Sequence, residues 1–401
     1  MLENTGKILL SSNKVCCVLT AIIKLKETNS KMNNKQSNRR KNIGIWISEK
    51  KSQKLNWKEL IKTCNSHGYN LIKLDLEKPL EDQTECDVFL HKLTDVIAAS
   101  DQGDLKALHI ICNVQQYLSN HPNTTVIDPI DNVRILLNRH CYYSILQEEL
   151  SLQRHGIFTP NFAEFKTCNI EQNVEIMRQW GVSFPVICKP TIAHGSKSAH
   201  EMVLIFNKKG LNACKPPCVV QSFVNHNAVL HKVFVVGNRY HICQRPSLKN
   251  FNASEELEPI FYTTGEVCKA DSRSTLSILD PHDKPDVKLT LDENKIKPII
   301  KLLREKIGLL LTGFDVVIDN TTGNHAVIDI NVFPSYDNFP NFFDHLLDCI
   351  DENVNKMSNG DSCHTSSSNG LNDYYCNYIS NGFINVGQST NRLSVTGMNI
   401  N

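Results

Sequence analysis

The sequence predicts an α/β protein in which a parallel sheet is followed by antiparallel hairpins. From residue 42 to about 146, short apolar runs alternate with helical segments, which is the pattern of a parallel sheet. Further on, two pairs of apolar runs are joined by short polar turns that contain Gly237 and Gly323. The chain has 401 residues, of which 41% are hydrophobic, so it is long enough for two or three domains.

Net charge and cysteine usage exclude several classes of protein. A net charge of +1 argues against a general nucleic-acid or membrane-surface binder, so any anion site must be a local group of cations. The 15 cysteines include no Cys-x-x-Cys; Cys214 and Cys218 have metal-like spacing but no companion pair. We expect reduced thiols in a cytoplasmic protein. The apolar run 15–23 is too short to span a bilayer, and no heptad or apolar patch indicates more than a monomer.

The N-terminal α/β region is predicted to have strands at residues 42–47, 69–74 and 87–93. Asn56 caps the first long helix, and Gly68 ends it. Ligands of parallel sheets bind at the carboxyl ends of strands, where Lys51 and Lys92 lie. Each of these lysines is therefore a candidate anion ligand; the alternative is a solvated surface lysine.

A long helix is predicted from Pro129 to about Gln153, with Arg134 in its first turn. A cation at a helix N-terminus opposes the helix dipole. Arg134 is thus either a ligand for an anion or an ordinary surface arginine.

The middle of the chain is predicted to contain strands at 184–190, 202–206 and 218–224. Lys189 lies inside an apolar strand, where a charge requires an anion partner unless the side chain reaches solvent. The loop 193–198 lacks the Walker pattern. A hairpin follows, with strands at 231–236 and 239–244; its first strand carries Lys232, and the second leads into the basic segment 245–250.

Residues 252–288 are predicted to be irregular, and a final helix is expected at 338–354. Between them, Thr290 and Glu293 form a capping box for a helix that runs to Ile307.

The hairpin with strands 314–319 and 325–332 carries the clearest chemical signal. Alternation places Asp315, Asp329 and Asn331 on one face; the apolar face then comprises Phe314, Val316, Ile318, Ile328, Ile330 and Val332. If the loop closes symmetrically, Asp315 lies opposite Asp329, with Cβ atoms about 5 Å apart. A divalent cation such as Mg²⁺ would relieve the repulsion between them. The alternative is a surface hairpin with solvated acids.

These segments together resemble the inositol-tetrakisphosphate 1-kinase (inositol 1,3,4-trisphosphate 5/6-kinase) family of the ATP-grasp superfamily. The resemblance covers roughly residues 44–350 and rests on 46–51 (WISEKK), 91–95 (HKLTD), 193–195 (AHG), 216–221 (PPCVVQ), 225–230 (NHNAVL), 244–251 (QRPSLKNF) and 327–331 (VIDIN).

The resemblance implies an ATP-grasp fold: an N-terminal parallel α/β domain followed by two α+β domains whose antiparallel sheets clasp ATP. We expect a flexible extension (1–41), the N-terminal domain (42–146), a central domain (147–232), a C-terminal domain with the metal hairpin (233–355) and a disordered tail (356–401).

The resemblance also assigns site residues. ATP would be bound by Arg134, Lys189, Gln221, Lys232 and Ser247, with residues 221–232 along the adenine and ribose. Inositol phosphates would be bound by Lys51, Lys92, His200, Lys232, Asn331 and Ser335, and Mg²⁺ by Asp315, Asp329 and Asn331. No general base is evident, and Lys189 and Lys232 are the electrostatic candidates.

Two departures from the family pattern concern the substrate side. Ser335 stands where the family usually has glycine, and the loop between Lys189 and His200 is one residue longer than usual.

The expected activity is transfer of the ATP γ-phosphate to inositol 3,4,5,6-tetrakisphosphate at the 1-position and to inositol 1,3,4-trisphosphate at the 5- or 6-position. The partners are then ATP and soluble inositol polyphosphates, without nucleic acid or membrane insertion. The alternatives are an ATP-grasp carboxylate-amine ligase and a non-catalytic inositol phosphate binder.

Overall fold

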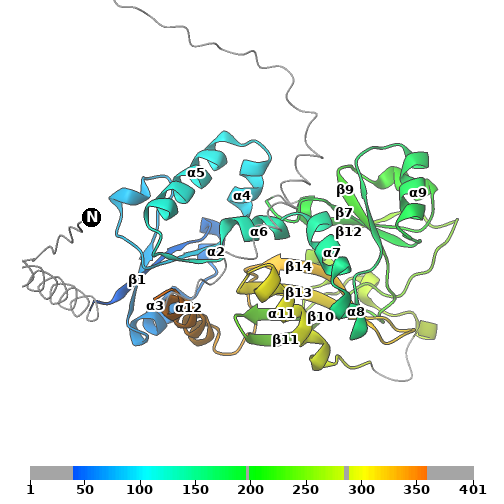
Figure 1. The fold of residues 1–401 in the computed structure, drawn as a ribbon. Coiled ribbons are helices and arrows are strands. Elements are labelled where there is room, and N and C mark those ends of the chain that lie inside the picture. The colour runs from blue at the N-terminus through cyan, green and yellow to red at the C-terminus, as the bar shows by residue number, and fades with distance from the viewer. Residues whose placement is uncertain (1–38, 196–197, 284–288, 359–401) are drawn as a thin grey trace, which may run out of the picture.

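The computed structural model describes residues 39–195, 198–283 and 289–358. Residues 359–401 of the predicted tail and 1–38 of the predicted N-terminal extension lie outside these residues, whereas 356–358 are helical and Lys41 is in a strand. Three sheets make up the fold, one parallel and two mainly antiparallel (Figure 1). The predicted α/β class is confirmed.

The N-terminal sheet is parallel, with strand order β2-β1-β3-β4. Its strands are β1 (Lys41–Trp46), β2 (Tyr69–Lys73), β3 (Val88–His91) and β4 (Thr125–Ile127). Helices α4 (Thr94–Asp101) and α5 (Leu105–Asn120) cover one face; α3 (Trp57–Ser66) and α12 (Phe342–Ser358) cover the other (Figure 1). Asn56 caps α3 through the backbone N–H of Glu59, as predicted.

The central sheet is antiparallel, with strand order β12-β8-β7-β9-β6. Its strands are β6 (Phe162–Phe165), β7 (Val186–Pro190), β8 (Glu201–Ile205), β9 (Cys218–Ser222) and β12 (Ile260–Thr263). Helix α9 (Ile170–Gln179) packs on the face that includes Phe165 and Val186. Strand β12 and the short helix α10 (Thr264–Val267) lie in the segment predicted to be irregular, so that prediction was incomplete.

The C-terminal sheet has strand order β11-β10-β13-β14-β5. It comprises β10 (Val229–Val236), β11 (Arg239–Pro246), β13 (Leu311–Ile318), β14 (His325–Val332) and the parallel strand β5 (Ile157–Phe158). Its core face packs against helices α7 (Arg139–Glu148), α8 (Leu150–Arg154) and α11 (Ile296–Lys301). Both predicted hairpins are therefore present.

The long helix predicted between Pro129 and Gln153 was wrong. The chain forms α6 (Ile130–Leu136), α7 and α8 instead. Asn138 is extended and caps α7, and the backbone on either side of it bonds to the segment after β7: Arg139 N donates to Thr191 O, and Ala193 N donates to Leu137 O, both at 2.9 Å. The helix breaks because this backbone pairs with the central sheet.

The predicted capping box of Thr290 and Glu293 was also wrong. The side chain of Asp292 caps this segment instead, by accepting from Asn294 N. The segment continues through Glu293–Lys295, α11 and a π-helical turn at Leu302–Lys306. Gly308, with a φ of 76°, follows it.

The predicted domain boundaries remain a proposal. The boundary between residues 232 and 233 falls inside β10, while β5 and β12 each join a sheet built mainly from another part of the chain.

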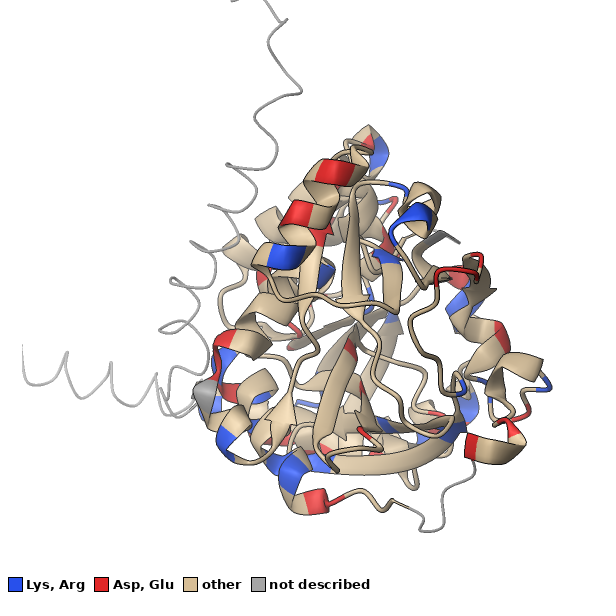
Figure 2. Cartoon of the chain, turned by 90° about the vertical axis from the view of Figure 1, so that its right-hand side faces the viewer, with Lys and Arg blue, Asp and Glu red and all other residues tan. Residues whose placement is uncertain are grey.

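Charged residues of both signs are interspersed over the helices and loops (Figure 2). No helix in the described part of the chain combines the length and apolar character that crossing a bilayer requires.

Candidate active site

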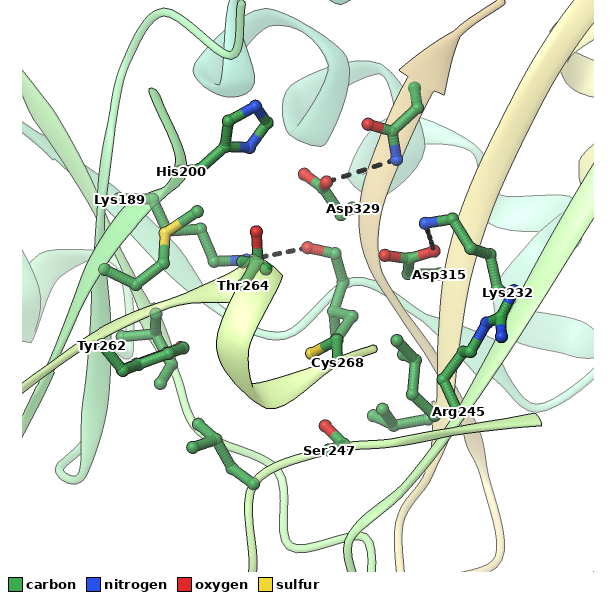
Figure 3. A pocket seen from close by; sticks show the side chains of 18 of the residues that line it. Lys189, His200, Lys232, Arg245, Ser247, Tyr262, Thr264, Cys268, Asp315 and Asp329 are labelled. Atoms are coloured by element: carbon green, nitrogen blue, oxygen red, sulfur yellow. Dashed lines mark hydrogen bonds and ion pairs between the residues drawn. The ribbon is translucent and has the colours of Figure 1, made fainter. Parts of the chain in front are cut away.

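A cavity of about 550 Å³ lies between the central and C-terminal sheets. Figure 3 shows Lys189 on one wall, Asp315 and Lys232 on the other, and the segment of Thr264 and Cys268 between them. Eight predicted site residues line this cavity: Lys189, His200, Gln221, Lys232, Ser247, Asp315, Asp329 and Asn331. The structure thus brings together residues that are spread over the sequence from Lys189 to Asn331.

One row of paired residues crosses the C-terminal sheet and supplies the charges on that wall. Lys232 of β10 pairs with Asp315 of β13, which pairs with Asp329 of β14. The two aspartates therefore lie directly opposite each other, as the symmetric loop predicted. Lys232 Nζ donates to Asp315 Oδ1 at 2.8 Å. Burial alone would lower the pKa of Lys232, but the carboxylate of Asp315 outweighs it and raises that pKa.

The prediction for the apolar face of this hairpin was wrong at Ile328. A β-bulge lies next to the aspartate pair, so that Val316 pairs with Val327 and Ile328 is left without a partner on β13. Val327 consequently enters the core in place of Ile328, which lines the cavity instead. The backbone oxygen of Ile328 accepts from Tyr143 Oη at 2.6 Å and from Lys189 Nζ at 2.8 Å.

Asp329 is surrounded by donors. Tyr142 Oη donates to its Oδ1 at 2.7 Å, Asn331 Nδ2 donates to its Oδ2 at 3.4 Å, and Arg139 Nε lies 3.7 Å from Oδ1. Burial alone would raise the pKa of Asp329, but Arg139, Lys189 and the Tyr142 hydroxyl together lower it. Asp315 differs, because burial and the nearby Asp329 raise its pKa against the opposing effect of Lys232.

The carboxylates of Asp315 and Asp329 and the amide of Asn331 fit a hard divalent cation. Two carboxylates at paired positions bring like charges close together, and all three side chains line the same cavity. Oxygen donors of this kind, completed by phosphate oxygens and water, are what Mg²⁺ requires. These residues could therefore hold Mg²⁺.

Lys189 joins the two walls of the cavity. Its Nζ lies 2.8 Å from each of three oxygens: Tyr143 Oη, Gln221 Oε1 and Ile328 O. Its side chain is buried, and this burial lowers the pKa of Lys189 to about 8. All three of its hydrogen-bond partners are neutral, so none of them balances the positive charge, which attracts an anionic ligand into the cavity; a direct bond to that ligand would replace one of the three.

A hydrogen-bonded pair at His226 lies further along the cavity. Its Nδ1 is 2.6 Å from the backbone oxygen of Val224, and its Nε2 is 2.7 Å from Ser247 Oγ. Because a carbonyl only accepts, Nδ1 carries the proton and Nε2 accepts from the serine. Burial lowers the pKa of His226 to about 4, so the ring is neutral at physiological pH.

Lys51 and Lys92 follow the adjacent strands β1 and β3, as predicted, and do not line the cavity. Lys51 Nζ lies 3.8 Å from an Asp95 carboxylate oxygen. Lys92 Nζ donates to the backbone oxygen of Phe333, directly after the strand that carries Asn331. Burial, reinforced by Lys51, lowers the pKa of Lys92 to about 7. These two cations therefore lie where the N-terminal sheet meets the end of β14.

The helix-dipole argument for Arg134 was wrong, because α6 is short and Arg134 lies in its last turn. Its guanidinium bonds to Asp101 and Asp131, and it does not line the cavity. Ser335 also lies outside the cavity lining; it is exposed, and its φ is not in the left-handed region. Serine is thus accommodated at this position without backbone strain.

Sequence reasoning missed Arg139, Tyr142 and Tyr143. Arg139 is buried and donates to the backbone oxygens of Pro190 at 2.6 Å and Ala199 at 3.1 Å. The adjacent tyrosines Tyr142 and Tyr143 within a helical pattern could have indicated a polar site. Their hydrogen-bond partners, however, lie about 190 positions away in the sequence, on β14.

Comparison with known proteins yields a consistent result. Residues 151–352 match the family described as inositol 1,3,4-trisphosphate 5/6-kinase ATP-grasp domain, and residues 42–133 match the corresponding pre-ATP-grasp domain. The chain is 42% identical to inositol-tetrakisphosphate 1-kinase from Xenopus laevis (79% of this chain, 82% of the relative) and 42% identical to that from Danio rerio (80% and 82%).

A solved D-cycloserine synthetase has a similar fold, with a TM-score of 0.51 at 12% identity over 78% of this chain and 99% of the synthetase.

Proposed function

The chain belongs to the inositol 1,3,4-trisphosphate 5/6-kinase family and is an inositol polyphosphate kinase with an ATP-grasp fold; from that premise, we propose its substrates and the role of each site residue. It transfers the γ-phosphate of ATP to the 1-hydroxyl of inositol 3,4,5,6-tetrakisphosphate and to the 5- or 6-hydroxyl of inositol 1,3,4-trisphosphate. The observation that carries this proposal is the row of Lys232, Asp315 and Asp329, which faces Lys189 across the cavity.

ATP is bound between the two antiparallel sheets. Lys189 and Lys232 bind its phosphates, and their positive charges offset the negative charge that develops on the transferred group. Gln221 and the segment up to Lys232 line the adenine and ribose, and Ser247 orients the nucleotide through its position beside His226. Mg²⁺, held by Asp315, Asp329 and Asn331, would neutralise phosphate charge.

The inositol phosphate is bound beside the cavity, where the N-terminal sheet meets the end of β14. Lys51, Lys92 and His200 come from different elements, but all three lie near Asp95. The Asp95 carboxylate pairs with Lys51, and it raises the pKa values of Lys92 and His200 against the effect of burial. Lys51 and Lys92 supply positive charge that suits a polyanion. Burial lowers the pKa of His200, so its ring takes part as a neutral hydrogen-bonding group. The acceptor hydroxyl is aligned in line with the γ-phosphate, and positioning replaces a strong general base.

The protein acts as a cytoplasmic monomer on soluble substrates. The cysteines in the described part of the chain are free thiols, which supports a reducing compartment. Size-exclusion chromatography with light scattering tests the oligomeric state.

The decisive experiment measures MgATP consumption by the purified chain against a panel of inositol tris- and tetrakisphosphates, with product isomers resolved by chromatography. We expect 1-phosphorylation of the tetrakisphosphate and 5- or 6-phosphorylation of the trisphosphate. Asp329→Ala should nearly abolish turnover while the circular dichroism spectrum stays native. Transfer to other hydroxyls would overturn the proposed regiochemistry, and undiminished turnover of the folded variant would overturn the metal assignment.

A further inference from the structure

Three cysteines converge on the side of the central sheet that faces away from the active-site cavity. Cys188 lies in β7, Cys218 is the first residue of β9, and Cys214 directly follows the 3₁₀ helix Lys209–Ala213. Their Sγ atoms all lie within 4.8 Å of one another. Their exposed fractions are 5%, 1% and 8%, so all three thiols are buried.

The sheet register explains why these side chains meet. In the antiparallel β7–β9 pair, Pro190 is opposite Cys218 and Cys188 is opposite Val220. Cys188 and Cys218 are therefore diagonal neighbours on one face of the sheet. The chain between Cys214 and Cys218 then folds back over that face. All three are free thiols.

The donor set is specific in its chemistry. All three ligand atoms are sulfur, and the surrounding core is apolar, with Phe165, Met177, Val186, Val203 and Ile205 among its members. Thiolates select soft, thiophilic cations such as Zn²⁺ and Cu⁺ over Mg²⁺. With metal–sulfur bonds of about 2.3 Å, three thiolates around one ion have sulfurs about 4 Å apart, which the observed grouping accommodates.

We propose that Cys188, Cys214 and Cys218 form a structural site for one thiophilic metal ion, either Cu⁺ in a three-thiolate site or Zn²⁺ with a fourth ligand. The candidate fourth ligand is the exposed Cys168, whose Sγ is not among the three sulfurs grouped within 4.8 Å and would have to move toward them. Only Zn²⁺ requires this fourth ligand, because Zn²⁺ in structural sites is four-coordinate and tetrahedral.

The site would hold the segment 214–218 against β7, directly behind the active site. Cys188 and Lys189 are consecutive in β7, and alternation points them to opposite faces of the sheet. Cys188 belongs to the apolar core of the central sheet, whereas Lys189 lines the cavity. We therefore expect a bound ion to stabilise the central sheet without contacting substrate.

The test uses the full chain, purified under reducing, anaerobic conditions and stripped of metal. Titration with Co²⁺ should give sulfur-to-cobalt charge-transfer absorption that saturates at one ion per chain. Zn²⁺ should displace the cobalt, and Cu⁺ binding should be measured by competition with a chromogenic Cu⁺ chelator. Saturating metal should raise the melting temperature by roughly 4 °C.

The carboxylates of the active site are a possible second place for Co²⁺, but they cannot produce a thiolate band. Asp329→Asn should therefore leave that band intact. Cys214→Val, which keeps the position apolar, should weaken binding beyond the roughly 10–100-fold expected for loss of an outer-shell partner. The matched control is Cys64→Val, at a buried cysteine of α3, which should bind metal like the parent chain.

Cys168→Ser distinguishes the two ions, since it should lower the affinity for Zn²⁺ and leave the affinity for Cu⁺ unchanged. Metal titration of the parent chain tests the proposal even if the variants fail to fold. Absence of both a Co²⁺ thiolate band and Cu⁺ binding at excess metal, or equal metal binding by folded Cys214→Val, would show that these are only core thiols and would overturn the proposal.

Discussion

The ammonium nitrogen of Lys189 lies 2.8 Å from the backbone oxygen of Ile328, the residue that the β-bulge leaves unpaired in β14. This hydrogen bond joins the central sheet to the C-terminal sheet. In a regular hairpin the backbone groups of the strands bond to the neighbouring strand. Here the bulge leaves the Ile328 carbonyl free to accept from both Lys189 and Tyr143. The irregularity therefore positions the lysine relative to the aspartate pair.

The first prediction concerns the charge of Lys189. Burial lowers its pKa to about 8, so the free enzyme loses the ammonium charge as the pH rises through that value. Because kcat/KM reports ionisation of the free enzyme, kcat/KM for ATP should fall above about pH 8. Lys189→Arg keeps its charge and should remove this fall. Lys189→Met should lower kcat/KM for ATP about 10²–10³-fold at pH 7. Initial rates between pH 6.5 and 9.5 check both expectations.

Lys208→Met is the matched control for these variants, because Lys208 is exposed and pairs only with Glu171 at the surface. Its pH profile should coincide with that of the parent chain. A fall above pH 8 that persists in Lys189→Arg would assign the ionisation to another group.

The second prediction concerns the aspartate pair. Asp315→Asn and Asp329→Asn each remove one of two opposed carboxylates, so Mn²⁺ affinity, measured by electron paramagnetic resonance titration, should fall more than about tenfold. Asp344→Asn, at an exposed position in the first turn of α12, should bind Mn²⁺ normally. If both pair variants kept the parent affinity, the cation would have to be held elsewhere.

The third prediction concerns Arg139, whose guanidinium spans three backbone oxygens and Asp329. Lysine keeps the charge but cannot reach all of these groups, so Arg139→Lys should lower the free energy of unfolding by about 1–3 kcal/mol. Urea denaturation gives this value. Arg178→Lys at an exposed surface pair should change it by less than about 0.5 kcal/mol. Equal effects would mean that the buried hydrogen bonds of Arg139 contribute nothing.

Local patterns were sufficient to predict the aspartate pair but not its surroundings. Asp315 and Asp329 followed from strand alternation and a short loop, both of which are local in sequence. The backbone oxygen of Ile328, next to the bulge, bonds to Tyr143 and Lys189, which come from distant segments. The break at Asn138 depends on backbone pairing with residues 191–193, and Arg139 binds carbonyl oxygens that any residue type would offer. Such backbone partners leave no signature in a single sequence.

The last prediction concerns Ser335, at the position where the family resemblance led us to expect glycine. Ser335 is exposed, and its φ does not require glycine; its neighbours Phe333 and Tyr336 carry the left-handed conformations, with φ of 41° and 54°. The remaining advantage of glycine is room beside the substrate, close to the contact between Lys92 and Phe333. Ser335→Gly should therefore lower KM for the inositol phosphate about three- to tenfold and leave KM for ATP unchanged.

Ser335→Ala distinguishes the side chain's size from its hydroxyl group. If room is the limit, alanine should give a KM between those of serine and glycine. If both variants instead raise KM, the serine hydroxyl binds substrate and the serine is an adaptation of this chain to its own inositol phosphate. Steady-state kinetics with each inositol phosphate at saturating MgATP separates these outcomes, because Ser335 lies outside the cavity proposed to bind ATP.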